Sequence, residues 1–376
     1  MAGSWRLRRL VHRAIALARR SLATALYWSG ALAIWRRRRR PRNGPIVLMY
    51  HSIGGAGLSP DIVVSQEHFR RHIEYLRRHY CLLSLDHVVG LLEVGQQMPR
   101  HAVVVTLDDG YHDNHEKALP ILKRYRCPAT LFIAVESVMT GRVPWSQTLW
   151  RWLQSTREPE LRISWGGGNG TTTEKVLSLR SEHDRAEARI WLRGFAGGLG
   201  RRERQDFLKA LAQRLACSVE PDHGRSRAML TWDQLREMVR WGITIGSHTV
   251  THPRLSGLDS GAVRQELVES RSTLERELSA DVRLFAYPFG GWQDFNEDTK
   301  AAVGEAGYRA ACAAVVGNGG PSVDLRALDR LYVPDEPLRM FALRLLHLET
   351  DSRLLGWLLG SNWVHDREVP CYASVR

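Results

Sequence analysis

The chain has 376 residues, of which 44% are hydrophobic and 25% are charged. These proportions are typical of a globular protein and exclude the collagen-like, low-complexity and wholly disordered classes. The five cysteines are scattered, form no CxxC pair and are odd in number, which argues against a disulfide scaffold and an all-cysteine zinc site. The length suits one large domain with insertions or two smaller domains.

The formal net charge of +13 is concentrated at the amino terminus. Residues 1–43 contain twelve arginines, no lysine and no acidic residue, so this segment carries +12 and leaves +1 for the remainder. From Leu7 to Ala25, apolar residues recur at helical spacing and arginines occupy the other face. We therefore predict that residues 1–43 form a basic amphipathic helical tail that lies on an anionic membrane surface.

Two features of this tail bear on its location. The uncharged run from Ser21 to Trp35 has fifteen residues, whereas a helix needs about 20 apolar residues to span a bilayer. Residues 31–33 resemble a signal-peptidase site, but the five arginines at 36–40 would oppose export. We expect a peripheral protein at the cytoplasmic face of the membrane. The alternatives are an uncleaved membrane anchor, and a solvated tail or nucleic-acid arm.

Beyond the tail, short apolar runs alternate with amphipathic segments. The runs are almost continuously apolar, which is typical of strands buried on both faces of a parallel sheet. The number of β/α units favours a barrel over an open sheet. Strands are predicted at residues 46–50, 102–107, 129–134, 243–246, 284–287 and 308–315, and helices at 69–79, 116–125, 232–241, 262–278 and 297–306.

Residues 142–230 interrupt this alternation. They contain a tryptophan cluster, a glycine-rich loop at 166–170 and basic helical patterns around 186–215. We interpret them as a helical insertion on the barrel rather than as a separate catalytic unit. The predicted organisation is therefore a tail at 1–43, a barrel at 44–350 that carries this insertion, and a carboxyl-terminal tail at 351–376.

Ionisable side chains follow two of the predicted strands, and the catalytic groups of barrels lie at the carboxyl ends of strands. The second strand leads into Asp108 and Asp109, two carboxylates that are costly to bury unless they are paired or bind a cation. The fourth leads into His248 and His252, whose spacing can present both imidazoles on one side of a turn. Two imidazoles and one carboxylate predict an open, zinc-type catalytic site, and the second aspartate would be free to act as a base.

A third strand end is consistent with such a site. The apolar run that begins at Leu284 continues into the turn Tyr287-Pro288-Phe289-Gly290, whose backbone amides could face the site. Amide donors in that position stabilise the oxyanion of an acyl-transfer intermediate.

Three motifs in this order resemble those of the polysaccharide deacetylases, metal-dependent hydrolases that remove acetyl groups from N-acetylated sugars. Residues 106–110 resemble the family's T-F-D-D-G motif, residues 248–253 its H-[ST]-x-x-H-P motif, and residues 285–290 the F-A-Y-P variant of its third motif. Residues 47–52 resemble the start of the exopolysaccharide-associated branch. The resemblance covers roughly residues 44–340 and implies a distorted, incomplete (β/α) barrel of parallel strands.

The resemblance also implies a role for residues of these motifs. Asp109, His248 and His252 would be the metal ligands, and Asp108 would be the general base that activates water for attack on the acetamide carbonyl. The backbone N–H of Phe289 would stabilise the oxyanion, and acetate would be released. The implied cofactor is a divalent metal, Zn²⁺ first and Co²⁺ or Ni²⁺ as alternatives, because open His/carboxylate sites accept all three.

Two departures from the family pattern concern the catalytic machinery. Many members have an arginine where Ala286 stands, and Arg330 is our candidate to orient the catalytic aspartate in its place. The family's late leucine–histidine motif, the source of its general acid, has no clear match, so His347 and His51 are both candidates for the site.

We therefore expect a hydrolase that removes N-acetyl groups from N-acetylhexosamine residues of a glycan, in exopolysaccharide or cell-envelope metabolism. Trp145, Trp150, Trp292 and Tyr111 are candidates to stack on sugar rings, with core packing as the alternative for each tryptophan. A catalytically weak or inactive glycan-binding protein on the same fold is the alternative function. A nucleic-acid partner is not expected, because the body of the chain is nearly neutral.

Overall fold

The computed structural model describes residues 21, 24–31, 34, 44–166, 172–218, 227–315 and 323–350, without the side chains of 347–350. At its centre is a sheet of eight strands in the order β11-β10-β9-β6-β5-β1-β12, with β4 added beside β5. All of its pairings are parallel, as the sequence predicted. The strands are β1 (Ile46–Tyr50), β4 (Cys81–Leu82), β5 (Ala102–Asp109), β6 (Ala129–Ile133), β9 (Thr244–Ser247), β10 (Leu284–Ala286), β11 (Ala310–Cys312) and β12 (Leu331–Tyr332).

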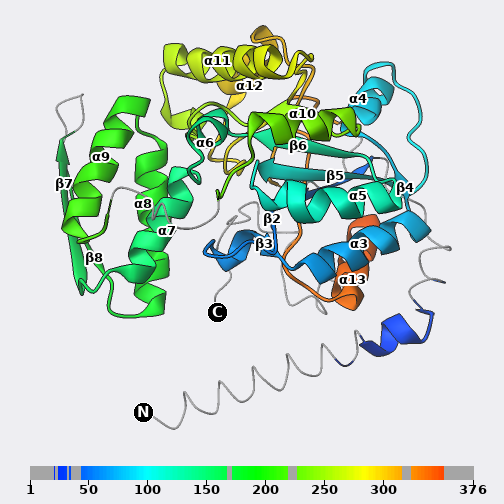
Figure 1. Ribbon diagram of the computed structural model, residues 1–376, viewed down its shortest axis with the longest axis horizontal. Coiled ribbons are helices and arrows are strands. Elements are labelled where there is room, and N and C mark those ends of the chain that lie inside the picture. Colours follow the sequence, from blue (N-terminus) through cyan, green and yellow to red (C-terminus); the bar gives the residue numbers. More distant parts are fainter. Residues whose placement is uncertain are drawn as a thin grey trace.

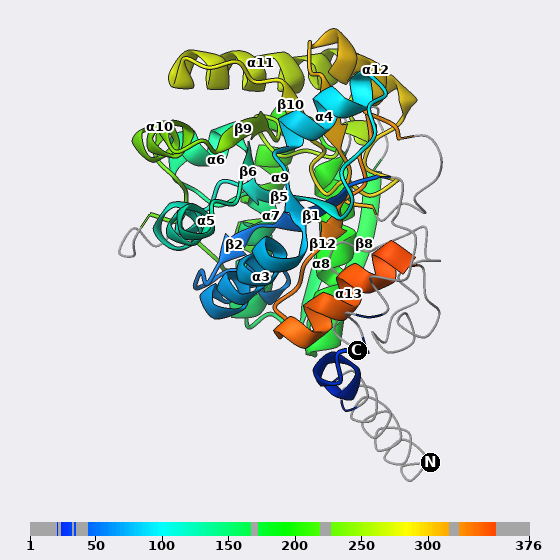
Figure 2. The same ribbon diagram turned by 90° about the vertical axis from the view of Figure 1, so that its right-hand side faces the viewer.

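Helices surround this sheet (Figures 1 and 2). Several begin with a side-chain cap: in α10, for example, Thr231 and Gln234 form the predicted capping box, and Gly242 follows the helix with a φ of 83°. A short parallel pair, β2 (Ser52–Ile53) and β3 (Val63–Val64), lies beside the carboxyl end of β1. The helices are α3 (Gln66–His79), α4 (Leu85–Glu93), a π-helical turn (Asn114–Ala118) with α5 (Leu119–Tyr125), α6 (Val135–Thr140), α10 (Trp232–Arg240), α11 (Ser260–Leu278), α12 (Glu297–Glu305) and α13 (Leu338–Thr350).

An irregular segment joins the two ends of the sheet. Strands β11 and β12 end the strand order, but residues just before β12 pair with the β11 side. The Leu328 N–H donates to the Ala311 carbonyl at 2.8 Å, and the Arg330 N–H donates to the Val315 carbonyl at 3.0 Å. Strand β12 itself pairs with β1. This irregular segment, residues 328–330, is called the seam below. It distorts the barrel and places Arg330 between the two ends of the sheet.

Two predicted strands end two or more residues away from the predicted position, and the others end within one residue of it. Strand β5 continues through Asp108 and Asp109, because both residues keep their register with β6. The strand predicted at 308–315 is shorter, because the Ala314 N–H turns away to donate to the Gly290 carbonyl at 2.8 Å. Strands β2, β3 and β4 and helices α4, α6 and α13 were not predicted.

The insertion has a small core of its own and lies to one side of the barrel (green in Figure 1). The prediction that it is helical was incomplete, because an antiparallel hairpin precedes its last two helices. Leu161 and Ile163 alternate with Arg162 and Ser164 along the first strand, and this period of two is the signal that the sequence analysis missed. Its elements are α7 (Trp145–Ser155), β7 (Glu160–Gly166), β8 (Thr172–Ser178), α8 (Glu182–Gly197) and α9 (Arg201–Arg214).

Both predicted tails lie mainly outside the described residues. Of the segment 1–43, the structure describes residues 21, 24–31 and 34, where Trp28 and Ile34 are exposed. Residues 351–376 are not among those described. Across the described part of the chain, no helix combines the length and the apolar character that crossing a membrane requires.

A buried histidine joins α3 to the segment before α13. The His72 ring is fully buried and stacks on Phe341, with 4.0 Å between ring centroids. Its Nε2 lies 2.9 Å from the Glu336 carbonyl and its Nδ1 lies 3.3 Å from the Tyr50 hydroxyl. Because a carbonyl only accepts, Nε2–H donates to it, and Nδ1 accepts from Tyr50 in the neutral ring. Burial lowers the pKa of His72 to about 3.

We expect His72 to make the protein less stable in mild acid. Its pKa is about 3 in the fold and 6.5 in an exposed chain, so below pH 6.5 the unfolded chain takes up a proton that the native chain does not. The free energy of unfolding therefore falls as the pH decreases from 6.5 towards 3. Between about pH 6.5 and pH 5, urea denaturation should show that His72→Gln loses about 2 kcal/mol less than the wild type.

The matched control is His87→Gln, which removes an exposed histidine of α4. The free energy of unfolding of this variant should change with pH in the same way as that of the wild type. A His72→Gln variant with the wild-type dependence would contradict the assignment of the acid sensitivity to His72.

Candidate metal centre and active site

Four ionisable side chains converge at the carboxyl edge of the sheet. Asp108 and Asp109 end β5, His248 directly follows β9, and His252 lies in the same loop. One ligand atom each of Asp109, His248 and His252 lies within 4.8 Å of the others, and all three residues are buried. Asp109 Oδ1 is 3.6 Å from His248 Nε2 and 3.4 Å from His252 Nε2. The structure thus brings together the three residues that the sequence analysis nominated as metal ligands.

The sheet fixes the orientation of His248. Its backbone N–H donates to the Ile133 carbonyl at 2.9 Å, and its Nδ1 lies 2.7 Å from the Ala286 carbonyl. Because that carbonyl accepts, Nδ1 carries the proton and Nε2 presents a lone pair to Asp109. Burial lowers the pKa of His248 to about 4, so the ring is neutral near pH 7, as a metal ligand must be.

The two oxygens of Asp109 have different partners. The Tyr111 hydroxyl donates to Oδ2 at 2.9 Å, whereas Oδ1 is buried and receives no hydrogen bond from the described residues. Burial raises the pKa of Asp109, but His252, His51 and His248 together lower it below its ordinary value. The group is therefore an ionised carboxylate with one open oxygen.

This donor set fits a divalent transition metal. A buried carboxylate oxygen without a donor is costly, and it faces the lone pair of His248 Nε2 rather than a proton. A cation between Asp109, His248 and His252 would satisfy all three groups. One carboxylate and two imidazoles leave open coordination positions, as in catalytic sites.

Four residues at this edge have strained backbones. Asp109, Thr249, His252 and Phe289 have φ values of 73°, 68°, 55° and 62°, in the left-handed region that side chains with a Cβ rarely adopt. Such conformations cost about 1–3 kcal/mol each and persist only where the surrounding structure enforces them. Their concentration around one cluster of ionisable groups marks this edge as a functional site.

Asp108 is paired with the candidate arginine. Arg330 Nη1 donates to Asp108 Oδ1 at 2.7 Å and Nη2 donates to Oδ2 at 2.8 Å, and both side chains are almost fully buried. The Arg330 Nε also donates to the Ala313 carbonyl at 3.0 Å. Burial raises the pKa of Asp108, but Arg330 and the neighbouring histidines lower it below its ordinary value. The carboxylate is therefore ionised and held in one orientation.

The other two candidate residues lie at the same edge. His51 follows β1, its Nδ1 is buried without a hydrogen bond to the described residues, and the charges of Asp109 and Asp108 act on its ring. Burial nevertheless lowers the pKa of His51 below its ordinary value. The Phe289 ring contacts that of His252, with 4.9 Å between centroids, and its backbone N–H has no partner among the described residues. The side chain of His347 lies outside the described residues.

A family model for polysaccharide deacetylases matches residues 95–157 and 206–311. The chain belongs to the polysaccharide deacetylase family. It is therefore a carbohydrate deacetylase. The unmatched residues between the two segments cover the hairpin and α8 of the insertion. The curated relative YxkH of Bacillus subtilis (strain 168), also assigned to the polysaccharide deacetylases, is 23% identical over 300 residues, which are 80% of this chain and 74% of the relative.

Two solved structures share the fold of this deacetylase. The Streptococcus pyogenes deacetylase PplD, in complex with acetate, matches with a TM-score of 0.51 at 19% identity over 82% of this chain and 99% of that one. A polysaccharide deacetylase from Bacillus cereus matches with a TM-score of 0.50 at 19% identity over 80% of this chain and 68% of that one. The predicted barrel of parallel strands is confirmed.

One predicted sugar contact was wrong, and other polar contacts of the site were missed. Tyr111 is fully buried and donates to Asp109, so it cannot stack on a glycan. Trp292 is half exposed, and Trp145 donates its indole N–H to the His252 carbonyl at 2.9 Å. Glu266, a buried carboxylate of α11 beside the histidine loop, was not predicted, because no local pattern distinguishes it from the other acidic residues of its helix.

We expect removal of the Arg330 guanidinium to destabilise the fold. In Arg330→Met, Asp108 would keep a buried charge without its partner, which costs about 3–5 kcal/mol. Urea denaturation should show this loss of free energy. The double variant Asp108→Asn/Arg330→Met should recover part of it, because no uncompensated charge remains. Equal stability of the single and double variants would argue against the pairing of these two charges.

Proposed function

We propose that this deacetylase removes N-acetyl groups from N-acetylhexosamine residues of a polysaccharide or oligosaccharide, or of a lipid-linked sugar, in a metal-dependent hydrolysis that releases acetate. The observation that carries the proposal is the buried cluster of Asp109, His248 and His252 beside the Asp108–Arg330 pair. A role in exopolysaccharide or cell-envelope glycan metabolism is part of the proposal and is supported by the resemblance of residues 47–52 to the exopolysaccharide-associated branch.

Asp109, His248 and His252 would hold the metal, with Zn²⁺ as the first choice and Co²⁺ or Ni²⁺ as alternatives. When bound, such a metal supplies a Lewis acid that polarises the acetamide carbonyl and lowers the pKa of water. The hydrogen bond from His248 to the Ala286 carbonyl supports this assignment, because it turns the free Nε2 towards the other two ligands.

Asp108 is the proposed general base. Its pKa is held below the ordinary range, so it is free to accept the proton that water loses when it attacks the carbonyl carbon. Arg330 prevents the carboxylate from rotating and keeps it ionised. The Phe289 N–H, which has no partner in the described part of the chain, is the proposed donor to the oxyanion. The C–N bond then breaks, and the leaving nitrogen must gain a proton. His51, whose ring is affected by the charges of both aspartates, is proposed to carry to that nitrogen the proton that Asp108 accepted from water.

The proposal is tested by separating metal binding from hydrolysis. The purified full chain should hold about one divalent metal by elemental analysis and release acetate from N-acetylated glucosamine oligomers. His248→Ala and Asp109→Asn should lose both properties, because each removes a proposed ligand. Asp108→Asn and His51→Gln should keep the metal and lose most acetate release, typically at least 100-fold for the loss of a group that transfers a proton.

Three results would contradict parts of this scheme. An unchanged metal content in Asp109→Asn would refute the ligand assignment. Acetate release by Asp108→Asn at the wild-type rate would refute its role as base. Glycan binding that persists in Asp108→Asn, in a protein whose wild-type form never releases acetate, would favour the alternative of a glycan-binding protein on this fold.

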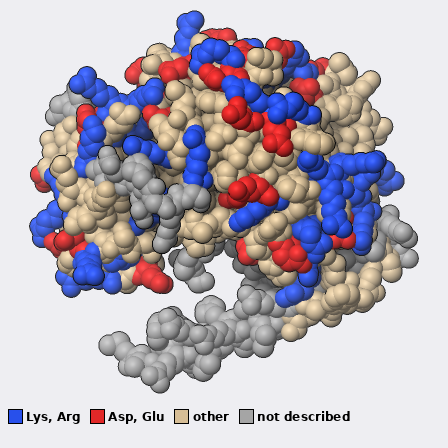
Figure 3. Space-filling view, viewed as in Figure 1, with Lys and Arg blue, Asp and Glu red and all other residues tan. Residues whose placement is uncertain are grey.

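We also propose that the basic tail at residues 1–43 holds the protein at an anionic membrane surface, peripherally and on the cytoplasmic side. The twelve arginines of this segment support the proposal. Further cations are exposed at the carboxyl ends of α3 and α5, where Figure 3 shows Lys and Arg side chains gathered at one end of the molecule. Trp241, 55% exposed, lies under the Lys123 ammonium, and tryptophan favours membrane interfaces.

We expect the full chain to sediment with phosphatidylglycerol-containing vesicles and to be released by salt, because the attraction is electrostatic. Replacing the five arginines at 36–40 with glutamine should weaken this binding by about 1 kcal/mol for each charge that lies near the surface. The control replaces five exposed arginines of the insertion and should bind like the wild type. Equal binding to pure phosphatidylcholine vesicles would contradict the proposal. The control positions are Arg157, Arg162, Arg180, Arg202 and Arg214.

A further inference from the structure

The loop that carries His252 leaves none of its backbone groups unpaired. Residues 249–252 include two of the four strained positions of the site, so the partners of their amide and carbonyl groups decide how firmly His252 is held. The N–H groups of Val250 and Thr251 both donate to Glu266 Oε2, at 2.8 and 2.9 Å. The His252 N–H donates to the Thr249 hydroxyl oxygen at 3.0 Å.

The four carbonyls of this loop are divided between the barrel and the insertion. The first two, of Thr249 and Val250, accept from the backbone N–H groups at the start of α6. The last two, nearest the candidate ligand, accept from side chains of the insertion. Arg204 of α9 donates to the Thr251 carbonyl at 3.3 Å and also to the Thr251 hydroxyl. The indole N–H of Trp145 in α7 donates to the His252 carbonyl at 2.9 Å.

Arg204 is an unusual residue for a surface insertion, because its side chain is 4% exposed. A buried guanidinium is costly unless it is paired and hydrogen-bonded. Its other nitrogen, Nη1, donates to the Leu199 carbonyl at 2.9 Å, and its guanidinium carbon lies 5.8 Å from the centre of the Trp145 ring. Glu266, the carboxylate whose charge acts most strongly on Arg204, accepts a hydrogen bond from the same threonine hydroxyl. Thr251 therefore lies between a buried cation and a buried anion.

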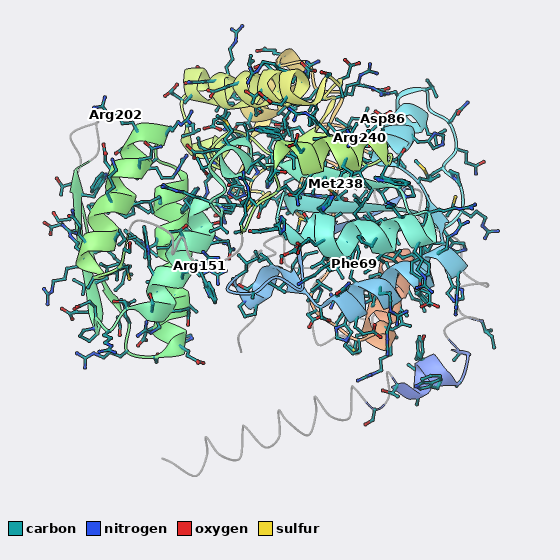
Figure 4. All side chains as sticks on the ribbon, in the orientation of Figure 1. Phe69, Asp86, Arg151, Arg202, Met238 and Arg240 are labelled. Atoms are coloured by element: carbon teal, nitrogen blue, oxygen red, sulfur yellow. The ribbon has the colours of Figure 1, made fainter. Side chains whose placement is uncertain are left out.

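The insertion also contacts the barrel beside this loop and in the segment between β2 and β3. The Arg254 N–H donates to the Gly197 carbonyl of α8 at 2.8 Å, and Arg193 of α8 lies over the Phe289 ring at 5.3 Å. Arg151 of α7, labelled in Figure 4, donates to the Gly57 carbonyl at 2.8 Å. These contacts fix the position from which Arg204 and Trp145 reach the histidine loop.

We propose that the insertion is a positioning element for the metal site: Arg204 and Trp145 hold the Thr251 and His252 carbonyls, and thereby keep the His252 imidazole directed at Asp109. The inference rests on the proposed metal site. It assigns a function to a part of the chain that supplies no proposed ligand and no proposed catalytic group. The loss of contacts that hold a metal ligand in place typically changes metal affinity or activity 10–100-fold.

The test measures metal affinity rather than turnover. Zinc is titrated into the metal-free full chain in competition with a chromophoric chelator. Arg204→Met, which keeps the length of the side chain and removes its donors, should bind zinc about 10–100-fold more weakly. Arg204→Lys should recover only part of the affinity, because one ammonium cannot reproduce the fork of the guanidinium. Trp145→Phe, which keeps a ring and loses the donor, should show a smaller loss.

The chain offers a matched control in Arg185, an arginine of α8 that also donates to backbone carbonyls, those of Leu153 and Thr156, but within the insertion. Arg185→Met should weaken the insertion and leave zinc affinity unchanged. Thermal unfolding of the metal-free Arg204→Met and Arg185→Met variants measures how far each substitution destabilises the fold, independently of zinc.

Two outcomes would overturn the inference. One is an Arg204→Met variant and a Trp145→Phe variant that both bind zinc as tightly as the wild type. The other is an Arg185→Met variant whose affinity falls as far as that of Arg204→Met, which would mean that any weakening of the insertion acts alike. A wild-type chain that takes up no metal would overturn it together with the metal site. A wild-type chain that binds zinc but releases no acetate would remove the proposed reaction and leave this inference in place.

Discussion

The bidentate ion pair between Arg330 and Asp108 connects the irregular seam of the barrel to strand β5, which lies between β6 and β1 in the sheet. Arg330 comes from the seam, where its backbone N–H and its Nε both donate towards the β11 side, and its two terminal nitrogens bind the carboxylate at the end of β5. A buried ion pair is weak evidence for stability, because desolvation offsets its attraction. What it provides here is a fixed geometry.

That geometry makes two adjacent carboxylates chemically different. Both oxygens of Asp108 are occupied by one guanidinium, whereas Asp109 has one oxygen bound to Tyr111 and one left open towards two imidazoles. The difference arises from the alternation of a strand, which directs successive side chains to opposite faces, and from the left-handed backbone of Asp109. One carboxylate is thereby suited to proton transfer and its neighbour to a cation, without any difference in residue type.

The sequence predicted the parts of this site that depend on local order along the chain. Strands with continuous apolar residues end in ionisable ones, and parallel strands end at one edge, so the sequence alone predicted that Asp109, His248 and His252 lie together. Arg330 became a candidate only because Ala286 stands where many family members have an arginine. The sequence did not predict how the seam pairs with its neighbouring strands. Arg204, Trp145 and Glu266 could not be assigned, because their contacts join segments far apart in the sequence. The hairpin β7–β8 was missed for a different reason: its alternation was visible, but the basic helical patterns around 186–215 led to a helical interpretation of the whole insertion.

The direction of the strands also bears on the substrate. The basic segment 1–43 precedes β1 and joins the sheet at its amino end, while the site lies at the carboxyl end. Strand β5 has 8 residues, which corresponds to roughly 26 Å between the two ends. With the proposed tail on a membrane and the strands upright on its surface, the site would face away from the lipid at about that distance. In that orientation a sugar attached directly to a lipid headgroup would lie too near the surface to reach the site, whereas a glycan chain that extends from the surface, or a free oligosaccharide, would reach it directly. Among the substrate classes in the proposed function, this placement favours a polymer or oligosaccharide over a lipid-linked precursor.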